Sequence, residues 1–191
     1  MNPVLLIRHG ATAGNLKKRY IGRTDQPLCA AGEAQLRRLA DDLPPCDHLF
    51  CSPLLRCRQT AALLYPGHNV CLVDDLRECD FGKFEGKTAD ELAGDADYHS
   101  WLAAGCLTPL PGGEAVDTFK QRCTQAFVHI LTAAPPGDRI GFIIHGGCIM
   151  AILERFAEPR IEFYQAHLDN GHYLAADWRA GRLFLTGGSL C

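Results

Sequence analysis

Hydrophobic positions along the chain follow two kinds of pattern, short unbroken runs and stretches with helical spacing. The unbroken runs predict buried strands at residues 3–9, 47–51, 70–73 and 140–145. The helical spacing predicts amphipathic helices over residues 30–43, 52–65, 116–134 and 148–156. Ser52 and Pro53 are typical of a helix N-cap followed by a first-turn proline. Two further runs, 172–178 and 182–186, flank a turn and predict a closing hairpin.

The order of these elements predicts an α/β fold. Strands that alternate with helices indicate a three-layer α/β/α sandwich, with a mainly parallel central sheet between two layers of helices. Residues 14–27 are polar and basic and predict a loop. The glycine-rich stretch 77–113 predicts an irregular cover inserted over the sheet. We therefore expect residues 1–191 to form a single domain.

Composition narrows the class of protein. With 191 residues, 47% of them hydrophobic and 21% charged, the chain is close to an average globular domain. A formal net charge of −3 argues against a nucleic-acid or membrane-surface partner. No run approaches the ~20 apolar residues of a membrane span, and the N-terminus lacks a signal-peptide pattern. We expect a cytoplasmic protein, and the composition leaves its oligomeric state open.

Cysteine is abundant, with ten residues in the chain. No two of them are spaced as C-x-x-C, which removes the usual zinc-knuckle and thioredoxin motifs. Several lie in apolar stretches, where a reduced thiol behaves as a small hydrophobic group: Cys51, Cys71, Cys123 and Cys148. We expect the cysteines to be reduced and structural, as is usual in the cytosol.

The candidate chemistry lies where two predicted strands end. His9 and His145 each close an apolar run and are each followed by glycine. Ligands of open α/β sheets bind at the carboxyl ends of the strands, and glycine lets a ligand approach the backbone closely. One such histidine is more often a core residue bonded to the backbone, but two in the same setting favour a site.

Two arginines point to the same crevice. Arg56 lies in the first turn of a predicted helix, where free N–H groups and a guanidinium together form an anion site. Arg8 directly precedes His9. Two arginines and two histidines in one crevice predict a phosphate pocket. The chain contains no nucleotide-binding glycine motif and no H-E-x-x-H zinc motif.

Five short blocks, in order along the chain, carry a family resemblance. They are residues 8–12 with Asn15, 52–54 with Arg56, 76–78, 111–114 and 145–147. Together they resemble the histidine phosphatase superfamily, which has the phosphoglycerate-mutase-like fold, over about residues 3–176. Residues 20–28 are most similar to the small bacterial branch that includes alpha-ribazole phosphatase. One departure is Ala115, where relatives often have serine.

The resemblance implies that His9 is the nucleophile and that Glu78 donates a proton to the leaving oxygen. It also implies that the phosphoryl oxygens are bound by Arg8, Asn15, Arg56, His145 and the Gly146 amide. A neutral imidazole is a competent nucleophile near pH 7. Because arginines stabilise the transferring phosphoryl group, no metal ion or other cofactor is expected.

Some roles stay open at this level. Asp80 or Glu85 is an alternative proton donor, and Thr12 either contacts the phosphate or holds the loop. The aromatic residues Phe84, Tyr98 and Trp101 either stack on a substrate ring or pack the cover onto the sheet. The remaining histidines are expected to be surface or structural residues: His48, His68, His99, His129, His167 and His172.

The expected function is hydrolysis of a small-molecule phosphate ester through a phosphohistidine. Alpha-ribazole 5′-phosphate is one candidate substrate, and a sugar phosphate or phosphoserine is another. The alternatives are a phosphoglycerate mutase-type transfer, a broad-specificity sugar phosphatase and a phosphate-binding module without activity. Lys83 and Lys87 are the only lysines in residues 77–113, which favours the hydrolase over a mutase with a basic, water-excluding lid.

Overall fold

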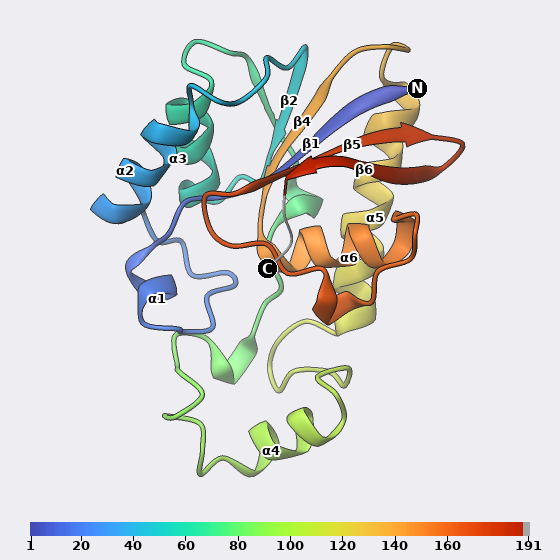
Figure 1. Cartoon of the computed structure of the whole chain (residues 1–191). Helices are drawn as coiled ribbons and strands as arrows, with labels where there is room; N and C mark the ends of the chain where they lie inside the picture. Colours follow the sequence, from blue (N-terminus) through green and yellow to red (C-terminus); the bar gives the residue numbers. More distant parts are fainter. Residues whose placement is uncertain (189–191) are drawn as a thin grey trace.

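The computed structural model describes residues 1–188, which contain a sheet of six strands in the order β3-β2-β4-β1-β5-β6 (Figure 1). Strands β1 to β4 are parallel, and β5 and β6 are antiparallel to their neighbours. The predicted, mainly parallel sheet is therefore confirmed, with the closing hairpin added along one edge. The strands are Asn2–Arg8, His48–Cys51, Val70–Leu72, Ile140–Ile144, Tyr173–Arg179 and Arg182–Gly188.

Helices cover both faces of the sheet, as Figure 1 shows. Successive residues of β1 point to opposite faces, because side chains alternate along a strand. Leu5 and Ile7 pack toward α2 and α3, whereas Val4 and Leu6 pack toward α5 and α6. This arrangement is the expected α/β/α sandwich. The helices are α1 Ala13–Leu16, α2 Ala30–Leu39, α3 Leu55–Leu64, α4 Ala96–Ala103, α5 Val116–Ala133 and α6 Gly146–Phe156.

Some predicted helix boundaries are wrong. Helix α3 begins at Leu55, so Ser52 is not its N-cap. The Ser52 hydroxyl instead contacts a buried histidine. The stretch 14–27, predicted as a loop, contains most of the short helix α1. Thr12 caps the N-terminus of this helix and forms a capping box with Asn15. Helix α6 begins at Gly146, two residues before the predicted start.

Residues 77–113 lie at one end of the molecule, where Figure 1 shows α4. They contain α4 and the short 3-10 helix Gly82–Phe84 but no strand. Their aromatic side chains pack together, since the Phe84 ring lies 5.5 Å from that of Tyr98 and 5.7 Å from that of Trp101. Phe84 and Tyr98 are therefore core residues of this segment. Across residues 1–188, no helix has the length and apolarity needed to cross a bilayer.

The cysteines among residues 1–188 are all free thiols. Cys51, Cys123 and Cys148 are buried, as their apolar surroundings predict. The expectation for Cys71 is wrong, because its strand β3 lies at the edge of the sheet and the side chain is exposed. Cys191, the tenth cysteine, lies outside the described residues.

Candidate active site

Two histidines meet at the carboxyl ends of neighbouring strands. Strands β1 and β4 pair in parallel up to Arg8 and Ile144, so the next residues, His9 and His145, emerge at the same edge of the sheet. The two imidazole rings are 5.1 Å apart in an edge-to-face arrangement. Both side chains are buried. The convergence predicted from the two strand ends is thus present in the structure.

The hydrogen bond of His9 decides which ring nitrogen is available. Its Nδ1 lies 2.7 Å from the carbonyl oxygen of Gly10. A carbonyl can only accept, so Nδ1 carries the proton and Nε2 keeps a free lone pair. Burial lowers the pKa of His9 well below 6.5, and the charges of Arg56 and Arg8 lower it further. The ring is therefore neutral at pH 7, with one nitrogen able to attack an electrophile.

Arg56 lies in the first turn of α3 and is 1% exposed. Its guanidinium donates to the carbonyl of Gly22 at 2.7 Å and to that of Thr24 at 2.9 Å. Its Nε donates to Nδ1 of His145 at 3.3 Å. These contacts hold a permanent positive charge in a fixed position beside both histidines.

Arg8 supplies a second positive charge at the end of β1. Its Nη1 donates to the carbonyl of Leu168 at 2.6 Å. A Cβ added to Gly146 would lie 3.0 Å from the Arg8 Cζ, so the guanidinium rests directly against the start of α6. Glycine at position 146 allows this close approach, and its amide lies at the positive end of a helix.

His145 occupies the N-cap position of α6. Because its Nδ1 accepts from Arg56, its Nε2 carries the proton, which points to the Ser52 Oγ at 2.7 Å. Burial lowers the pKa of His145 well below 6.5, and the charges of Arg56 and Arg8 lower it further. Neutral histidines beside two arginines leave an excess of positive charge that suits a phosphate dianion.

Glu78 reaches the same helix end from residues 77–113. Its Oε2 accepts from the Gly147 amide at 3.1 Å, and its Oε1 accepts from the Cys79 amide at 3.0 Å. A Cβ at Gly147 would lie 2.4 Å from Oε1, so only glycine leaves room for this carboxyl group. The Glu78 carboxyl group is thus held by the Gly147 amide. The preceding residue, Gly146, lies against Arg8.

The other two carboxylates considered from the sequence hold loops. Asp80 forms an ion pair with Arg23 at 3.1 Å and accepts from the Gly82 amide. Glu85 accepts from the amides of Gly22 and Thr24 at 2.8 and 2.9 Å. These contacts favour Glu78 as the acid–base group.

Asn15 and Thr12 form part of the turn that follows His9. The Asn15 Oδ1 accepts from the amide and hydroxyl of Thr12 at 3.0 and 3.1 Å. Thr12 therefore holds the loop, one of its two expected roles. The donor that Asn15 can offer to a phosphate is its Nδ2 group.

Sequence reasoning missed several supporting residues. It assigned Ser52 to a helix cap rather than to His145, and it gave no role to Thr60, whose Oγ1 accepts from the Gly10 amide at 3.1 Å. It also overlooked Arg122, which binds the backbone of Glu78. No local pattern signals these contacts, since each joins residues at least 44 positions apart.

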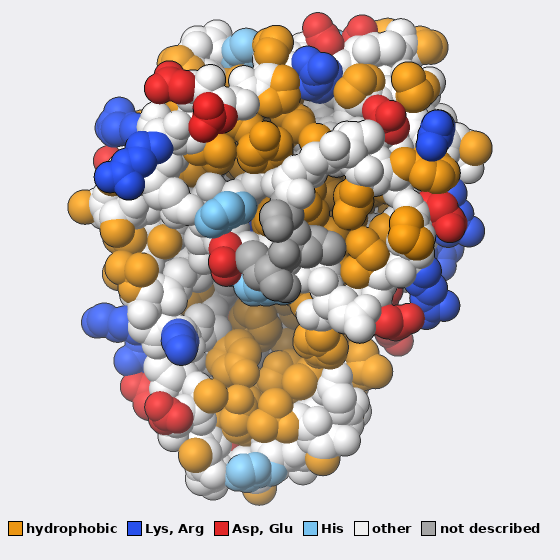
Figure 2. All heavy atoms as spheres, viewed as in Figure 1, with side chains coloured by type: hydrophobic (Ala, Val, Ile, Leu, Met, Phe, Trp, Pro, Cys, Tyr) orange, Lys and Arg blue, Asp and Glu red, His pale blue; other side chains and the backbone are white. Residues whose placement is uncertain are grey.

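A cavity of about 320 Å³ adjoins the charged groups. Arg8, Glu78, Gly146 and Gly147 form one side of it. The rest is largely apolar and comes from Tyr20, from residues 77–113, from α5 and α6, and from the segment around Phe163. Figure 2 shows hydrophobic side chains gathered in a hollow on the lower half of the face of the molecule in view. The apolar lining includes Tyr20, Phe81, Trp101, Leu110, Val116, Phe119, Met150, Phe163 and Tyr164.

Two assignments change with this cavity. Trp101 packs against the other aromatics, one of the two roles considered for it, and it also lines the cavity. His167, expected to be a surface or structural residue, borders the cavity as well. A larger hollow of about 800 Å³ lies elsewhere, between α5 and α6 near Arg182, and contains none of the residues predicted for the site.

The chain is similar to known proteins over most of its length. The model of the histidine phosphatase superfamily (branch 1) matches residues 4–187. The protein named "Probable phosphoglycerate mutase GpmB" from Enterobacter sp. (strain 638) is 30% identical over 192 residues, which cover 94% of this chain and 89% of the relative.

Solved structures are similar over nearly the whole length. The alpha-ribazole phosphatase of Shigella flexneri has a TM-score of 0.83 and 26% identity, covering 96% of this chain and 94% of its own. A phosphoglycerate mutase from Thermus thermophilus has a TM-score of 0.76 and 32% identity, covering 99% of this chain and 98% of its own. The neighbours thus include both phosphatases and mutases.

Proposed function

The chain belongs to the histidine phosphatase superfamily (branch 1), and from that premise we propose that it hydrolyses a phosphomonoester through a phosphohistidine at His9. One observation carries the proposal. The neutral His9 ring, with its Nε2 unprotonated, lies beside His145 and within the field of Arg8 and Arg56. A nucleophile beside fixed positive charge is what phosphoryl transfer requires.

The proposed reaction has two steps. In the first, the His9 Nε2 bonds to phosphorus, the bond from phosphorus to the ester oxygen breaks, and Glu78 gives that oxygen a proton. In the second, water attacks phosphorus, the bond from phosphorus to the His9 Nε2 breaks, and Glu78 takes the proton of the water, which releases phosphate and neutral His9. The groups proposed to hold the phosphoryl oxygens are Arg8, Asn15, Arg56 and the Gly146 amide, together with His145, whose Nε2–H would turn from the Ser52 Oγ to the phosphate.

The cavity supports a hydrolase rather than a phosphoglycerate mutase. A mutase must hold the carboxylate of phosphoglycerate, which calls for further cations near the phosphate site. Among the described residues that line the cavity, Arg8 is the one permanently charged cation. Lys83 does not line it and pairs with Asp95 at 3.0 Å and with Asp97. The cavity therefore offers a glycerate carboxylate little stabilisation.

The same lining favours a leaving group with an apolar, ring-shaped part. A volume of about 320 Å³ lies in the range of small-molecule sites, which are mostly apolar with a few polar anchors. Alpha-ribazole 5′-phosphate combines a phosphate with an aromatic base and fits this description. A sugar phosphate or phosphoserine would instead place polar groups against apolar walls, at a cost in desolvation.

Trapping of the intermediate tests the proposal. The enzyme is mixed with ³²P-labelled p-nitrophenyl phosphate and quenched in alkali, where phosphohistidine is stable and acyl phosphates are not. We expect the label on His9, and none on the His9→Ala variant. His129→Ala, an exposed histidine of α5, should be labelled normally. A label on another side chain, or equal turnover by wild type and His9→Ala, would overturn the proposal.

Product analysis separates the two reactions. The enzyme is incubated with 3-phosphoglycerate and a bisphosphoglycerate primer, and separately with a panel that includes alpha-ribazole 5′-phosphate. We expect free phosphate, with the highest kcat/KM for esters of aromatic character. If 2-phosphoglycerate forms faster than free phosphate, the protein is a mutase.

A further inference from the structure

We propose that Arg122 is a positioning residue that sets the place of Glu78 and so controls proton transfer to the leaving group. The inference rests on the proposed function, since it takes Glu78 as the proton donor. Arg122 lies in α5, outside the crevice that holds the two histidines. None of the sequence blocks that mark the site contains it.

Arg122 binds the backbone that leads into Glu78. Its Nη1 donates to the carbonyls of Asp75 and Arg77 at 2.8 and 2.7 Å, and its Nη2 donates to that of Glu78 at 3.1 Å. A guanidinium presents its N–H groups in a fixed fork, so three carbonyls bound at once define the path of the chain. The main chain of Glu78 is thereby fixed relative to α5.

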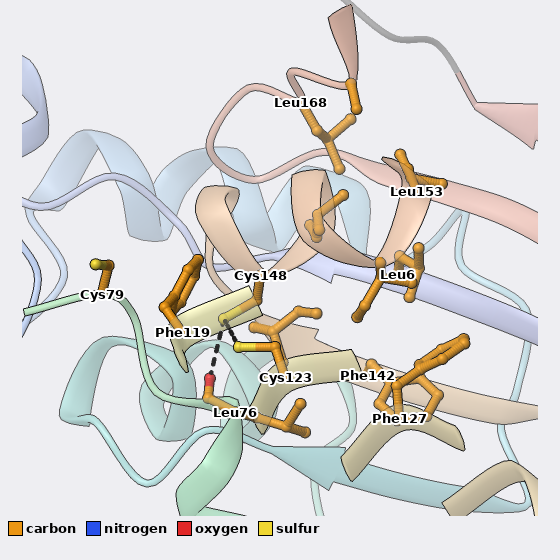
Figure 3. Close-up of a cluster of buried hydrophobic side chains, with 14 of the residues drawn as sticks. Leu6, Leu76, Cys79, Phe119, Cys123, Phe127, Phe142, Cys148, Leu153 and Leu168 are labelled. Atoms are coloured by element: carbon orange, nitrogen blue, oxygen red, sulfur yellow. Dashed lines mark hydrogen bonds between the residues drawn. The ribbon is translucent and has the colours of Figure 1, made fainter. Parts of the chain in front are cut away.

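Two buried thiols complete this contact. Cys123 donates to the Asp75 carbonyl at 3.5 Å, and the single S–H of Cys148 is shared between the carbonyls of Leu76 and Arg77, which lie 3.4 and 3.3 Å from its Sγ. Figure 3 shows Cys123 and Cys148 side by side, with Cys148 directed to the Leu76 oxygen. The backbone before Glu78 is therefore attached to both α5 and α6.

Glu114 orients Arg122 from the opposite side. Its two carboxylate oxygens accept from Nε and Nη2 of Arg122 at 2.7 and 2.8 Å, and both side chains are 18% exposed. Such a paired, partly buried contact fixes the plane of the guanidinium. Glu114 directly follows residues 77–113, and its amide donates to the Asp80 carbonyl at 3.0 Å. Arg122 thus joins the start of that segment to its end.

The position of the Glu78 carboxyl group depends on both attachments. Arg122 holds its main chain, and the Gly147 amide holds its Oε2 at the start of α6. Without Arg122 the main chain keeps only the weaker thiol contacts and can shift, and a shift of about 1 Å is enough to impair a proton transfer. The loss should appear only where the departing oxygen needs a proton.

Two substrates whose leaving groups differ in their need for a proton can test the proposal. Benzyl phosphate releases an alkoxide, which must be protonated as the bond to phosphorus breaks. The p-nitrophenolate ion leaves as a stable anion without a proton. Both leaving groups are aromatic and suit the cavity. The ratio of their kcat/KM values reports the step in which the leaving group departs, and therefore reports the proton donor.

The experiment compares this ratio in Arg122→Met, Arg122→Lys and Glu114→Gln with wild type. Glu78→Gln marks the complete loss of the donor. The matched control is Arg139→Met, because Arg139 also binds a carbonyl, that of Pro45, far from Glu78. We expect kcat/KM for benzyl phosphate to fall at least about 10-fold more than that for p-nitrophenyl phosphate in Arg122→Met, with Arg139→Met unchanged.

The other possible results also distinguish the role of Arg122 from the proposed function. If Arg122→Met does not fold, the same shift is expected in Arg122→Lys and Glu114→Gln, which retain the size and polarity of the pair. Equal slowing of both esters in folded variants, or no slowing, overturns the role of Arg122. If wild type hydrolyses neither ester, or Glu78→Gln leaves the ratio unchanged, it is the proposed function that fails.

Discussion

The Nε of Arg56 donates a hydrogen bond to the Nδ1 of His145 across 3.3 Å, inside the protein. A guanidinium never gives up its proton at physiological pH, so Nδ1 must accept and His145 must be neutral. The proton of His145 is thereby placed on Nε2, facing Ser52. In this way one arginine fixes both the charge and the tautomer of its neighbour.

The two buried histidines should make the protein sensitive to mild acid. Their folded-state pKa values lie well below 6.5, because burial and then the arginines disfavour the charged ring. The unfolded chain takes up protons at these rings as the pH falls below about 6.5, whereas the folded protein does not. The free energy of unfolding should therefore be highest above pH 6.5 and fall below it, by about 1 kcal/mol per histidine at pH 5.5.

Urea denaturation at pH 7.5 and 5.5 measures this loss. The double variant His9→Gln/His145→Gln should lose less stability over the same interval. Identical losses in the two proteins would show that the pKa values of the buried rings are not lowered on folding.

Ser52→Ala should slow catalysis without unfolding the protein. The change removes the partner of the His145 Nε2, which lies 2.7 Å from the Ser52 Oγ in a buried site. Without this partner the His145 ring is no longer held in place, and because misplacing such a group by about 1 Å can cost on the order of 100-fold in rate, kcat/KM should fall by roughly 10- to 100-fold. Steady-state kinetics with p-nitrophenyl phosphate checks the size of the effect. Ser100→Ala, which alters an exposed hydroxyl in α4, should have wild-type activity.

Gly147→Ala should displace the Glu78 carboxyl group. The new Cβ would lie 2.4 Å from its Oε1, closer than side-chain carbons come. We expect kcat/KM for benzyl phosphate to fall by at least about 10-fold, with a smaller loss for p-nitrophenyl phosphate. Gly94→Ala, where a Cβ meets nothing within 4 Å, is the control. Normal hydrolysis of both esters by Gly147→Ala would mean that Glu78 does not act where it lies.

Val116→Phe should change substrate preference. Val116 lines the apolar cavity, and a larger side chain there would occupy part of its volume of about 320 Å³. The expected result is a kcat/KM for 1-naphthyl phosphate that falls at least about 10-fold relative to that for ethyl phosphate. Parallel losses for both esters would indicate that the leaving group binds elsewhere.

The layered fold and the meeting of the two histidines could be predicted from the sequence because both follow from local patterns. An unbroken apolar run that ends in His-Gly places the histidine at the carboxyl edge of a parallel sheet, and two such runs place two there. The helix boundaries were less accurate. The Ser52-Pro53 pair has the form of a helix start, but the hydroxyl of Ser52 is taken by His145 and the helix begins at Leu55.

The supporting contacts could not be predicted, because they join distant parts of the chain. Glu78, Asp80 and Glu85 look alike as neighbours in sequence. They differ in their hydrogen-bond partners. Glu78 accepts from the Gly147 amide, whereas Glu85 accepts from the amides of Gly22 and Thr24. The exposure of Cys71 likewise depends on the place of β3 at the edge of the sheet. Burial at a sheet edge is a property of the assembled layers rather than of the run itself.

The attachment of both ends of residues 77–113 to Arg122 has an evolutionary consequence. An insertion or deletion between the two anchors leaves Glu78 at one end and Glu114 at the other in contact with the same guanidinium. The intervening chain can therefore diverge in length and composition while the residues around His9 keep their arrangement, provided that Glu85 keeps the loop that holds Arg56. A graft of this segment from a relative should carry the donor's substrate preference with it, which makes the segment an exchangeable module for redesign.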